Sequence, residues 1–308
     1  MKHPADALQG LSIFERGWLS SNNVLLHGAG AGAVLVDSSH SLHREQTLAL
    51  LQQALAGEPL RHLVNTHLHS DHCGGNAAVQ RAHRCRLSVP PGSFEAACAW
   101  DEDALSYKAT GQICEPFVPD DRIEPGQSVQ AGDRVWQAWA APGHDPHSII
   151  LHDAAQGVLI SADALWENGF GVVFPELDGE AGFDDVGRVL DLIETLGPQW
   201  VIPGHGAPFK DVAGALQRAR QRLAGFRADP ERHARHGMRV LIKYHLMEVR
   251  QQPWEAFSAW FCTVPLCQAV WARLGRPEGS LAAFGEHGAR QLLMSGALAL
   301  RQGQLADA

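Results

Sequence analysis

Short apolar runs alternate with stretches at helical spacing through the first part of the chain. The runs NVLLH (23–27) and AVLVD (33–37) flank GAGAG, which predicts a hairpin closed by glycines. Leucines then recur at helical spacing until Gly57, and RHLVN (61–65) predicts the next strand. CGGNAAVQRAHR (73–84) predicts the start of another helix. This order of elements favours a hairpin followed by a β-α-β unit.

A second set of apolar runs follows an irregular segment. Residues 90–134 are rich in Pro, Gly and Asp, although FEAACAWDEDALSYKA within them fits a helix. Such a segment forms either a lid over a site or a plain surface insertion. An amphipathic helix is predicted to end at Gly197. The apolar runs beyond the irregular segment predict strands at 134–141, 148–153, 157–163 and 199–203.

The pattern changes to helices after Pro208. Apolar residues at helical spacing predict helices around 216–226, 240–247, 253–261 and 268–274. The end of the chain, RQLLMSGALALRQGQL, predicts a helix followed by a short hairpin. We therefore expect two domains, one of residues 1–208 and a mainly helical one of residues 209–308.

The composition is that of a globular chain, but the charge is unevenly spread. Of the 308 residues, 45% are apolar and 19% are charged, which is an ordinary balance. The net charge of −9 divides into −15 for residues 1–207 and +6 for residues 208–308. Two domains that attract each other explain this division, and a nucleic-acid surface on the basic part is the alternative. The acidic first part argues against nucleic acid as the substrate.

The chain carries no obvious signal for export or membrane insertion. No apolar run is long enough to span a bilayer, and MKHPADALQGLSIFERG lacks the apolar stretch of a signal peptide. The six cysteines form no CxxC pair. We therefore expect a cytoplasmic protein with reduced thiols and no membrane partner. The oligomeric state stays open, with a homo-oligomer among the choices.

Candidate chemistry is concentrated in NTHLHSDHCGGN, directly after a predicted strand. His67 and His69 flank one residue, so both rings can point to one side at the strand end. Asp71 and His72 lie one turn further on and face a second point. Four ligands so close together fit two adjacent ions better than one. Two ions need more ligands from elsewhere, because zinc-like sites want at least four donors each.

Further ligands are expected where other strands end, because loops held by a rigid scaffold commonly carry function. His144 follows one strand in APGHDPHS, Asp163 ends another in GVLISAD, and His205 follows a third in IPGHG. All three can converge on one edge of the sheets, together with the ligands of the first cluster.

The motifs THLHSDH, PGH, SAD and PGHG, in this order, resemble the metallo-β-lactamase superfamily in its binuclear hydrolase branch. The motifs run from His67 to His205, and the flanking elements fit over about residues 10–208. The resemblance implies a four-layer αβ/βα sandwich with the site at one edge of two sheets. Glyoxalase II-like thioesterases share the full set of seven ligands, including the aspartate bridge.

The resemblance also implies a role for each ligand. The first metal would be held by His67, His69 and His144, and the second by Asp71, His72 and His205. Asp163 would bridge the two ions, which share a hydroxide that Asp71 orients, so Asp71 and Asp163 are the catalytic carboxylates. Two divalent cations lower the pKa of a bridging water and polarise the substrate. Zinc is expected first, and iron or manganese also suit these ligands.

Three more residues are candidates for contacts behind the ligands or with the substrate. Asp37 ends AVLVD, where superfamily members often have an aspartate that supports the ligand loop, and turn capping is the alternative. His147 lies in GHDPHS, which departs from the usual superfamily pattern. It is either a hydrogen-bond donor behind the ligands, a substrate contact, or a surface or packed histidine. Trp166 either lines a substrate pocket or packs in the core or at the rim.

Residues that differ from those of known subgroups of the superfamily reduce the number of reactions to consider. Asp163 argues against a true β-lactamase, Trp166 stands where lactonases have a tyrosine, and His69 stands where oxygen-reducing members have a glutamate. We therefore expect a metal-dependent hydrolase of a small ester or thioester, such as an acyl-CoA-like compound. The alternatives are a phosphodiesterase or nuclease of the same fold, a mononuclear-iron sulfur dioxygenase, and a metal-bound regulatory protein with little turnover.

The tail resembles the helical, winged-helix-like C-terminal domain of some hydrolases of this superfamily. LLMSGALALRQGQL would be its last helix and its wing. The tail shows no clear glutathione-binding set of basic residues. We expect it to pack against the catalytic domain and to shape the pocket.

Overall fold

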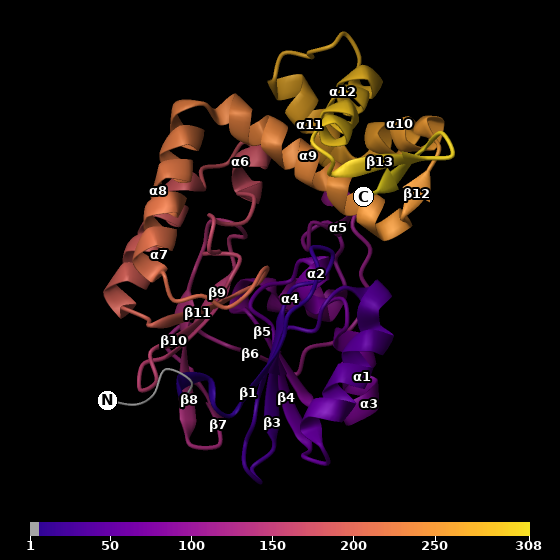
Figure 1. The fold of residues 1–308 in the computed structure, drawn as a ribbon. Helices are drawn as coiled ribbons and strands as arrows, with labels where there is room; N and C mark the ends of the chain where they lie inside the picture. The colour runs from indigo at the N-terminus through magenta and orange to yellow at the C-terminus, as the bar shows by residue number, and fades with distance from the viewer. Residues whose placement is uncertain (1–5) are drawn as a thin grey trace.

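Six strands in chain order form the first sheet of the computed structural model, which describes residues 6–308 (Figure 1). They are β1 (Leu11–Phe14), β2 (Asn23–Leu26), β3 (Ala33–Val36), β4 (Leu60–Val64), β5 (Arg86–Val89) and β6 (Asp121–Arg122). The antiparallel pairing of β2 with β3 confirms the predicted hairpin. Strands β3, β4 and β5 run parallel, which requires crossover connections.

Five strands form the second sheet, in the order β11-β10-β9-β8-β7. They are β7 (Ser128–Ala131), β8 (Arg134–Ala140), β9 (Ile149–Asp153), β10 (Val158–Ala162) and β11 (Trp200–Pro203). Neighbours are antiparallel except for β10 and β11, which run parallel. The four strands predicted in this region are confirmed.

Side chains at neighbouring positions of one strand face two different cores. On β2, Val24 and Leu26 pack between the two sheets, whereas Leu25 packs against the helices outside the first sheet. On β10, Ile160 packs between the sheets and Leu159 packs against the helices outside the second sheet. The layers are therefore helix, sheet, sheet and helix, which confirms the predicted four-layer sandwich.

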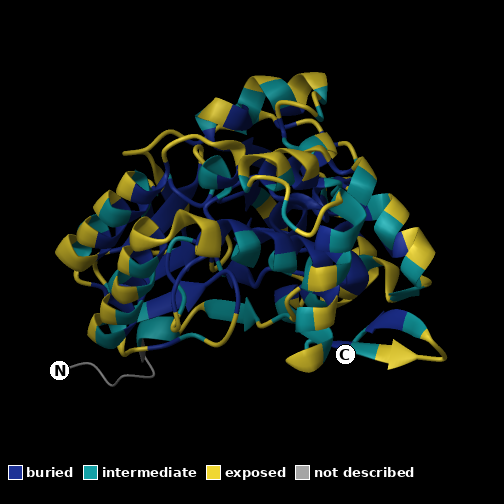
Figure 2. Cartoon of the chain, turned by 90° about the horizontal axis from the view of Figure 1, so that it is seen from above, coloured by how far each residue is buried: buried dark blue, intermediate teal, exposed yellow. Residues whose placement is uncertain are grey.

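Helices cover the outer face of each sheet, and their exposed residues face away from the buried centre (Figure 2). The first sheet is covered by α1 (Arg44–Leu55), α3 (Asn76–His83) and α4 (Pro91–Ala99). The second sheet is covered by α7 (Phe183–Leu196) and α8 (Val212–Ala228). Short helical turns join these elements: Asp6–Leu8, Ser41–His43, α2 (Ser70–Cys73), α5 (Tyr107–Thr110) and α6 (Phe174–Asp178).

Residues 90–134 are more regular than the sequence predicted. The segment contains α4, α5, β6 and β7, because even strands of two to four residues can pair with a sheet edge. Gln112 of this segment lines the cavity described below, so the segment forms part of its wall. Movement of the segment as a lid stays a prediction.

The tail is mainly helical, as predicted, and lies at the top of Figure 1. It consists of α9 (Pro230–Val249), α10 (Trp254–Thr263), α11 (Pro265–Arg273), α12 (Leu281–Met294) and a small sheet of β12 (Gln251–Gln252), β14 (Gln304–Asp307) and β13 (Leu298–Arg301). Helices α9 to α12 and strands β13 and β14 share one apolar cluster, to which Val172 and Leu177 of the first part contribute.

The domain boundary near residue 208 stays a prediction. Helix α8, which lies beyond that boundary, shares its apolar cluster with α7 rather than with the later helices. Among the described residues, no helix is both long and apolar enough to cross a membrane. The six cysteines are free thiols.

Candidate metal centre

The loop after β4 leads into the single helical turn α2 and carries four of the predicted ligands. His67 and His69 precede this turn, and Asp71 and His72 lie within it. All four side chains are buried, with exposed fractions between 0% and 8%. Buried polar groups need partners, so the arrangement is costly unless something binds them.

Two glycines let another loop pass close to α2. A Cβ atom at Gly74 would lie 2.5 Å from the backbone nitrogen of Ser41, and one at Gly75 would lie 2.2 Å from the carbonyl oxygen of Ser38. Any larger residue would push the 38–41 loop away from the ligand turn. The glycines of the opening motif therefore fix the backbone behind the ligands.

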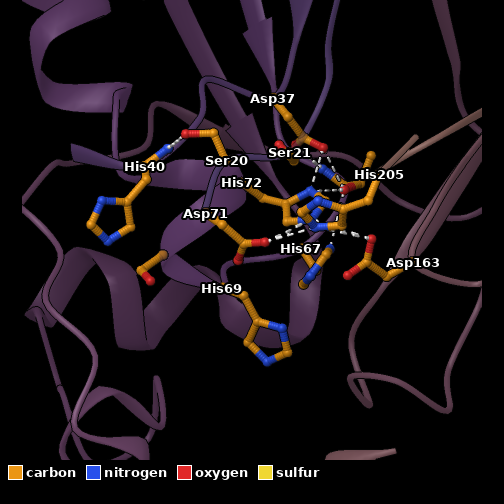
Figure 3. A network of polar contacts seen from close by, with 12 residues as sticks. Ser20, Ser21, Asp37, His40, His67, His69, Asp71, His72, Asp163 and His205 are labelled. Carbon is orange, nitrogen blue, oxygen red and sulfur yellow. Dashed lines mark hydrogen bonds and ion pairs between the residues drawn. The ribbon is translucent and has the colours of Figure 1, made fainter. Parts of the chain in front are cut away.

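The ends of three other strands bring the remaining ligands to the same place. His144 follows β8, Asp163 follows β10, and His205 follows β11. In Figure 3, the side chains of His72, Asp163 and His205, which come from different loops, point toward a common centre. Two groups of potential ligand atoms result, each with all its atoms within 4.8 Å of one another: His67, His69 and His144 in one, and Asp71, His72, Asp163 and His205 in the other.

Asp163 lies between these two groups. Its Oδ2 atom is 3.3 Å from Nε2 of His144, which belongs to the first group. Its Oδ1 atom is 3.5 Å from Nε2 of His72, which belongs to the second. The carboxylate therefore has the position that a bridging ligand requires, and the bridging role itself stays a prediction.

Hydrogen bonds behind the rings leave one nitrogen of each facing the centre. Nδ1 of His144 lies 2.6 Å from the carbonyl oxygen of Val172, to which it donates. Nδ1 of His72 lies 2.8 Å from Oδ2 of Asp37. In both rings Nε2 is left to point at the centre, as in metal sites where an outer partner fixes the ring.

Buried ring nitrogens without a partner show that the set fits metal ions. Nε2 of His67 and Nε2 of His72 have no hydrogen-bond partner and no access to solvent. An unpartnered buried polar atom costs roughly 1–3 kcal/mol. A divalent cation in each group would bind these nitrogens and offset that cost.

Asp37 holds the ligand loop through four hydrogen bonds to its carboxylate, one of them from the side chain of Asn65 at 3.4 Å. Its carboxylate accepts hydrogen bonds from the backbone nitrogen of Thr66 at 2.9 Å and from the Thr66 hydroxyl at 2.8 Å, besides the bond with His72. Its backbone has a φ of 58°, in the left-handed region that non-glycine residues rarely adopt. The side chain therefore supports the ligand loop directly rather than only capping a turn.

Burial and neighbouring charges favour the ligand forms of several residues. Burial lowers the pKa of His69 and of His144 to about 4, so both rings are neutral near pH 7. Burial alone would raise the pKa of Asp71, but His72 and His205 outweigh it and lower that pKa to about 2. Neutral imidazoles and ionised carboxylates are the forms that bind metals.

A cavity of about 520 Å³ opens above the two groups. Its lining includes Asp71 and Asp163 together with Trp18 and Trp166. The indole nitrogen of Trp166 donates a hydrogen bond to Oδ1 of Asp163 at 3.2 Å, and the Trp18 ring stacks on His205 with centroids 5.3 Å apart. Trp166 is therefore both a pocket residue and a direct partner of the shared carboxylate.

His147 lies elsewhere. Its side chain is exposed, and its ring lies where a Cβ atom on Gly92 would be, 2.2 Å from Nδ1. It is not among the residues that line the cavity. In this structure His147 is therefore an exposed histidine packed on α4, which agrees with the alternative of a surface histidine, and a role in contact with the substrate stays a prediction.

Helix α9, in the C-terminal part of the chain, forms another wall of the cavity. The hydroxyl of Tyr244 lies 2.7 Å from Oγ of Ser70, which itself donates to Oε1 of Gln112 at 2.8 Å. His40 and Glu248 form a buried pair at 3.0 Å between the first part of the chain and the same helix. These contacts join α9 to the loop that carries the ligands. Sequence reasoning missed them because isolated polar residues on a helix carry no motif.

Comparison with known proteins agrees with this geometry. A model of the metallo-β-lactamase superfamily matches residues 16–205, a range that contains all seven residues of the two groups. The chain belongs to the metallo-β-lactamase superfamily. The seven residues of the two groups were predictable because they lie in short motifs, whereas Trp18 and Tyr244 do not.

Individual members of the superfamily are similar over different shares of the chain. Acyl-coenzyme A thioesterase MBLAC2 of Gallus gallus is 27% identical over 154 residues, which cover 46% of this chain and 55% of that protein. A hydroxyacylglutathione hydrolase of Anaeromyxobacter dehalogenans is 30% identical over 160 residues, 52% of each chain. The chain thus spans about half the length of these curated relatives.

A solved structure extends the likeness of fold to nearly the whole chain. A metallo-β-lactamase family protein of Thermus thermophilus superposes with a TM-score of 0.57 at 20% identity. The match covers 97% of this chain and 99% of that one. The superfamily fold with its added C-terminal helices therefore has a precedent among known structures.

Proposed function

We propose that the protein is a hydrolase that uses two divalent cations on a small ester or thioester. The observation that carries this proposal is the position of Asp163, whose two oxygens face the two ligand groups at the floor of the cavity. A carboxylate shared in this way suits a pair of adjacent cations better than two independent sites. Zinc suits the donor set first, and iron or manganese are the alternatives.

Two cations held there would lower the pKa of a water molecule and polarise the bond to be cleaved. The residues of the chain would then position that water and the substrate. Asp71 lines the cavity, and its Oδ2 lies 3.0 Å from Nε2 of His205 in the same ligand group, so the carboxylate that would hold the second cation could also orient the water. Trp166 holds Asp163 in place through its indole N–H. Phe170 and Phe174 line the cavity and keep bulk water away.

The names of the relatives support a thioester substrate. One similar protein is named an acyl-coenzyme A thioesterase and another a hydroxyacylglutathione hydrolase, and both names describe cleavage of an acyl thioester. The glyoxalase II-like ligand set, with aspartate at the bridging position, supports the same chemistry. An acyl-CoA-like compound is the substrate class we favour.

We also infer that the tail is a winged-helix-like domain whose task is to shape the pocket. Helices α10 to α12 are followed by the hairpin of β13 and β14, which has the position of a wing. Helix α9 lines the cavity with residues such as Val240 and Met247. Because α9 closes the cavity in this way, we favour a role of the tail in binding the substrate over a role in binding nucleic acid.

The test is one preparation of the full chain examined in two ways. Metal content per chain is measured by mass spectrometry, and the protein is screened on matched thioesters, esters, lactones and phosphodiesters. We expect two divalent metals per chain and turnover of thioesters or esters. One iron per chain together with oxygen consumption would contradict the proposal of a hydrolase. Cleavage of phosphodiesters alone would contradict a thioester substrate and indicate a phosphodiesterase. Metal binding without any turnover would favour a regulatory protein.

A further inference from the structure

One part of the cavity wall carries positive charge without a counter-ion. Arg222 of α8 and Arg239 of α9 both line the cavity, and both side chains are partly buried. Within residues 6–308, neither guanidinium has a carboxylate oxygen within ion-pairing distance, whereas Lys243 of the same wall is paired with Asp307. Glu167 also lines the cavity, but its exposed carboxylate pairs with neither arginine.

Arg222 is held in a fixed position. Its guanidinium carbon lies 5.5 Å from the ring centroid of Phe170 and 5.3 Å from that of Phe226. Its Nη2 donates to Nε2 of His236 at 2.8 Å. A Cβ atom on Gly169 would lie 2.8 Å from its Nη1, so the guanidinium lies close against the Gly169 backbone. The remaining N–H groups are therefore presented in a defined direction, which lowers the entropy cost of binding a ligand.

His236 and Arg239 extend the same set of donors. Because Nε2 of His236 accepts from Arg222, its Nδ1 carries the proton of the neutral ring and is a donor. Burial, followed by the charges of Arg222 and Arg239, lowers the pKa of His236 to about 3, so the ring stays neutral. Arg239 donates one bond to Oε1 of Gln291 at 3.0 Å and keeps its other N–H groups.

We propose that Arg222, His236 and Arg239 form a subsite for an anionic group of the substrate, a carboxylate or a phosphate. This inference rests on the proposed function and names its substrate class: an acyl ester or thioester that carries a negative charge away from the bond to be cleaved. Partly buried cations without counter-ions are costly, and an anion with oxygen acceptors offsets that cost through charge-assisted hydrogen bonds.

The anion belongs to the substrate because the subsite and the ligands share one cavity. The same cavity of about 520 Å³ is lined by Arg222, Arg239, Asp71 and Asp163. That volume lies in the range of sites that enclose one small molecule. One molecule can therefore place its reacting carbonyl at the ligand groups and its anion at the arginines.

The experiment uses pairs of thioesters with the same acyl group that differ by one anionic group. N-acetylcysteamine and N-acetylcysteine thioesters differ by a carboxylate, and pantetheine and 4′-phosphopantetheine thioesters differ by a phosphate. In the metal-loaded protein, we expect kcat/KM to be about tenfold or more higher for the anionic member of at least one pair. The pair with the larger ratio identifies the anion.

Variants assign that ratio to the subsite. In Arg222→Gln and in Arg239→Gln we expect the ratio to fall to about one. The matched control is Arg220→Gln, which removes the same charge from the exposed face of α8, where Arg220 is paired with Asp191 and Glu194. The control should keep the ratio of the parent protein. If Arg222→Gln does not fold, Arg239→Gln alone decides.

Binding of non-hydrolysable ligands separates this inference from the proposed function. The S-methyl ethers of both pairs of thiols are titrated calorimetrically, and we expect the anionic ether of at least one pair to bind at least about tenfold more tightly in the parent protein but not in Arg239→Gln. If both thioester pairs are turned over with kcat/KM ratios near one, and the anionic and neutral ethers bind equally well, the proposed subsite is wrong. Tighter binding of the anionic ether without thioester turnover would support the subsite and overturn the thioesterase.

Discussion

The floor of the cavity and its α9 wall are built from different kinds of sequence. The floor is formed by the two ligand groups, which come from four strand ends and of which all but His67 and His72 line the cavity: His67, His69, Asp71, His72, His144, Asp163 and His205. The α9 wall consists of residues on one face of a single helix: His236, Arg239, Val240, Lys243, Tyr244 and Met247. The floor uses only metal-binding side chains, whereas the wall mixes cationic, polar and apolar ones.

The floor therefore determines the reaction, and the wall determines which substrates react. The chemistry of the floor allows only histidine and carboxylate at fixed positions, because the donors must converge on ions within about 2 Å of each ligand atom. The wall has no such restriction, since any set of side chains that complements the substrate serves. We therefore expect changes in the floor to affect every substrate alike and changes in the wall to affect substrates differently.

The largest expected effect comes from the carboxylate shared by the two ligand groups. In Asp163→Ala we expect kcat to fall by roughly a thousandfold for every ester and thioester, because metal catalysis contributes several kcal/mol that depend on correct ligation. The variant should also lose at least one metal per chain, measured by mass spectrometry after gel filtration. A variant with two metals and full activity would show that Asp163 does not bridge the ligand groups.

A smaller loss of activity is expected from Asp37, which supports the ligand loop. In Asp37→Ala, His72 and Thr66 lose their shared acceptor. We expect metal affinity or activity to fall about 10- to 100-fold, with no change in the preference among substrates. Competition with a chelator measures the affinity, and Asp37→Asn, which keeps the size of the side chain, is the matched control. Unchanged metal affinity in Asp37→Ala would limit Asp37 to capping the turn.

The smallest effect is expected where the floor and the wall meet. Tyr244→Phe removes the hydroxyl that lies 2.7 Å from Oγ of Ser70. We expect the free energy of unfolding to fall by about 1 kcal/mol and kcat/KM to fall a few-fold, because one partly buried hydrogen bond is lost. A double-mutant cycle with Ser70→Ala, read by denaturant unfolding, isolates this contact. Strictly additive losses in the cycle would mean that the two side chains act independently.

The sequence predicted the floor but only part of its surroundings. The ligands could be found because each follows an apolar run and lies in a short motif, and strand ends at one sheet edge must meet. Asp37 could be anticipated only as one of two alternatives, since a residue that ends a strand can also cap a turn. Its contacts with Thr66 and His72 depend on how the 38–41 loop packs on Gly74 and Gly75.

The wall could not be predicted for physical reasons. Arg222, Arg239 and Tyr244 lie on amphipathic helices, where helical spacing says which residues share a face but not which face meets the cavity. Trp18 lies in a loop far from any motif, and its stacking on His205 depends on tertiary packing. The strands β6 and β7 were missed because two to four residues give too short a pattern.

The most direct test of the central claim, that two cations share Asp163, is a titration of the metal-free protein with zinc. Thioester turnover and bound metal are measured in parallel at each step. We predict that activity rises until two equivalents are bound per chain and that Asp163→Ala binds at most one equivalent tightly. Full activity at one equivalent, or an unchanged binding curve in Asp163→Ala, would contradict a centre of two cations.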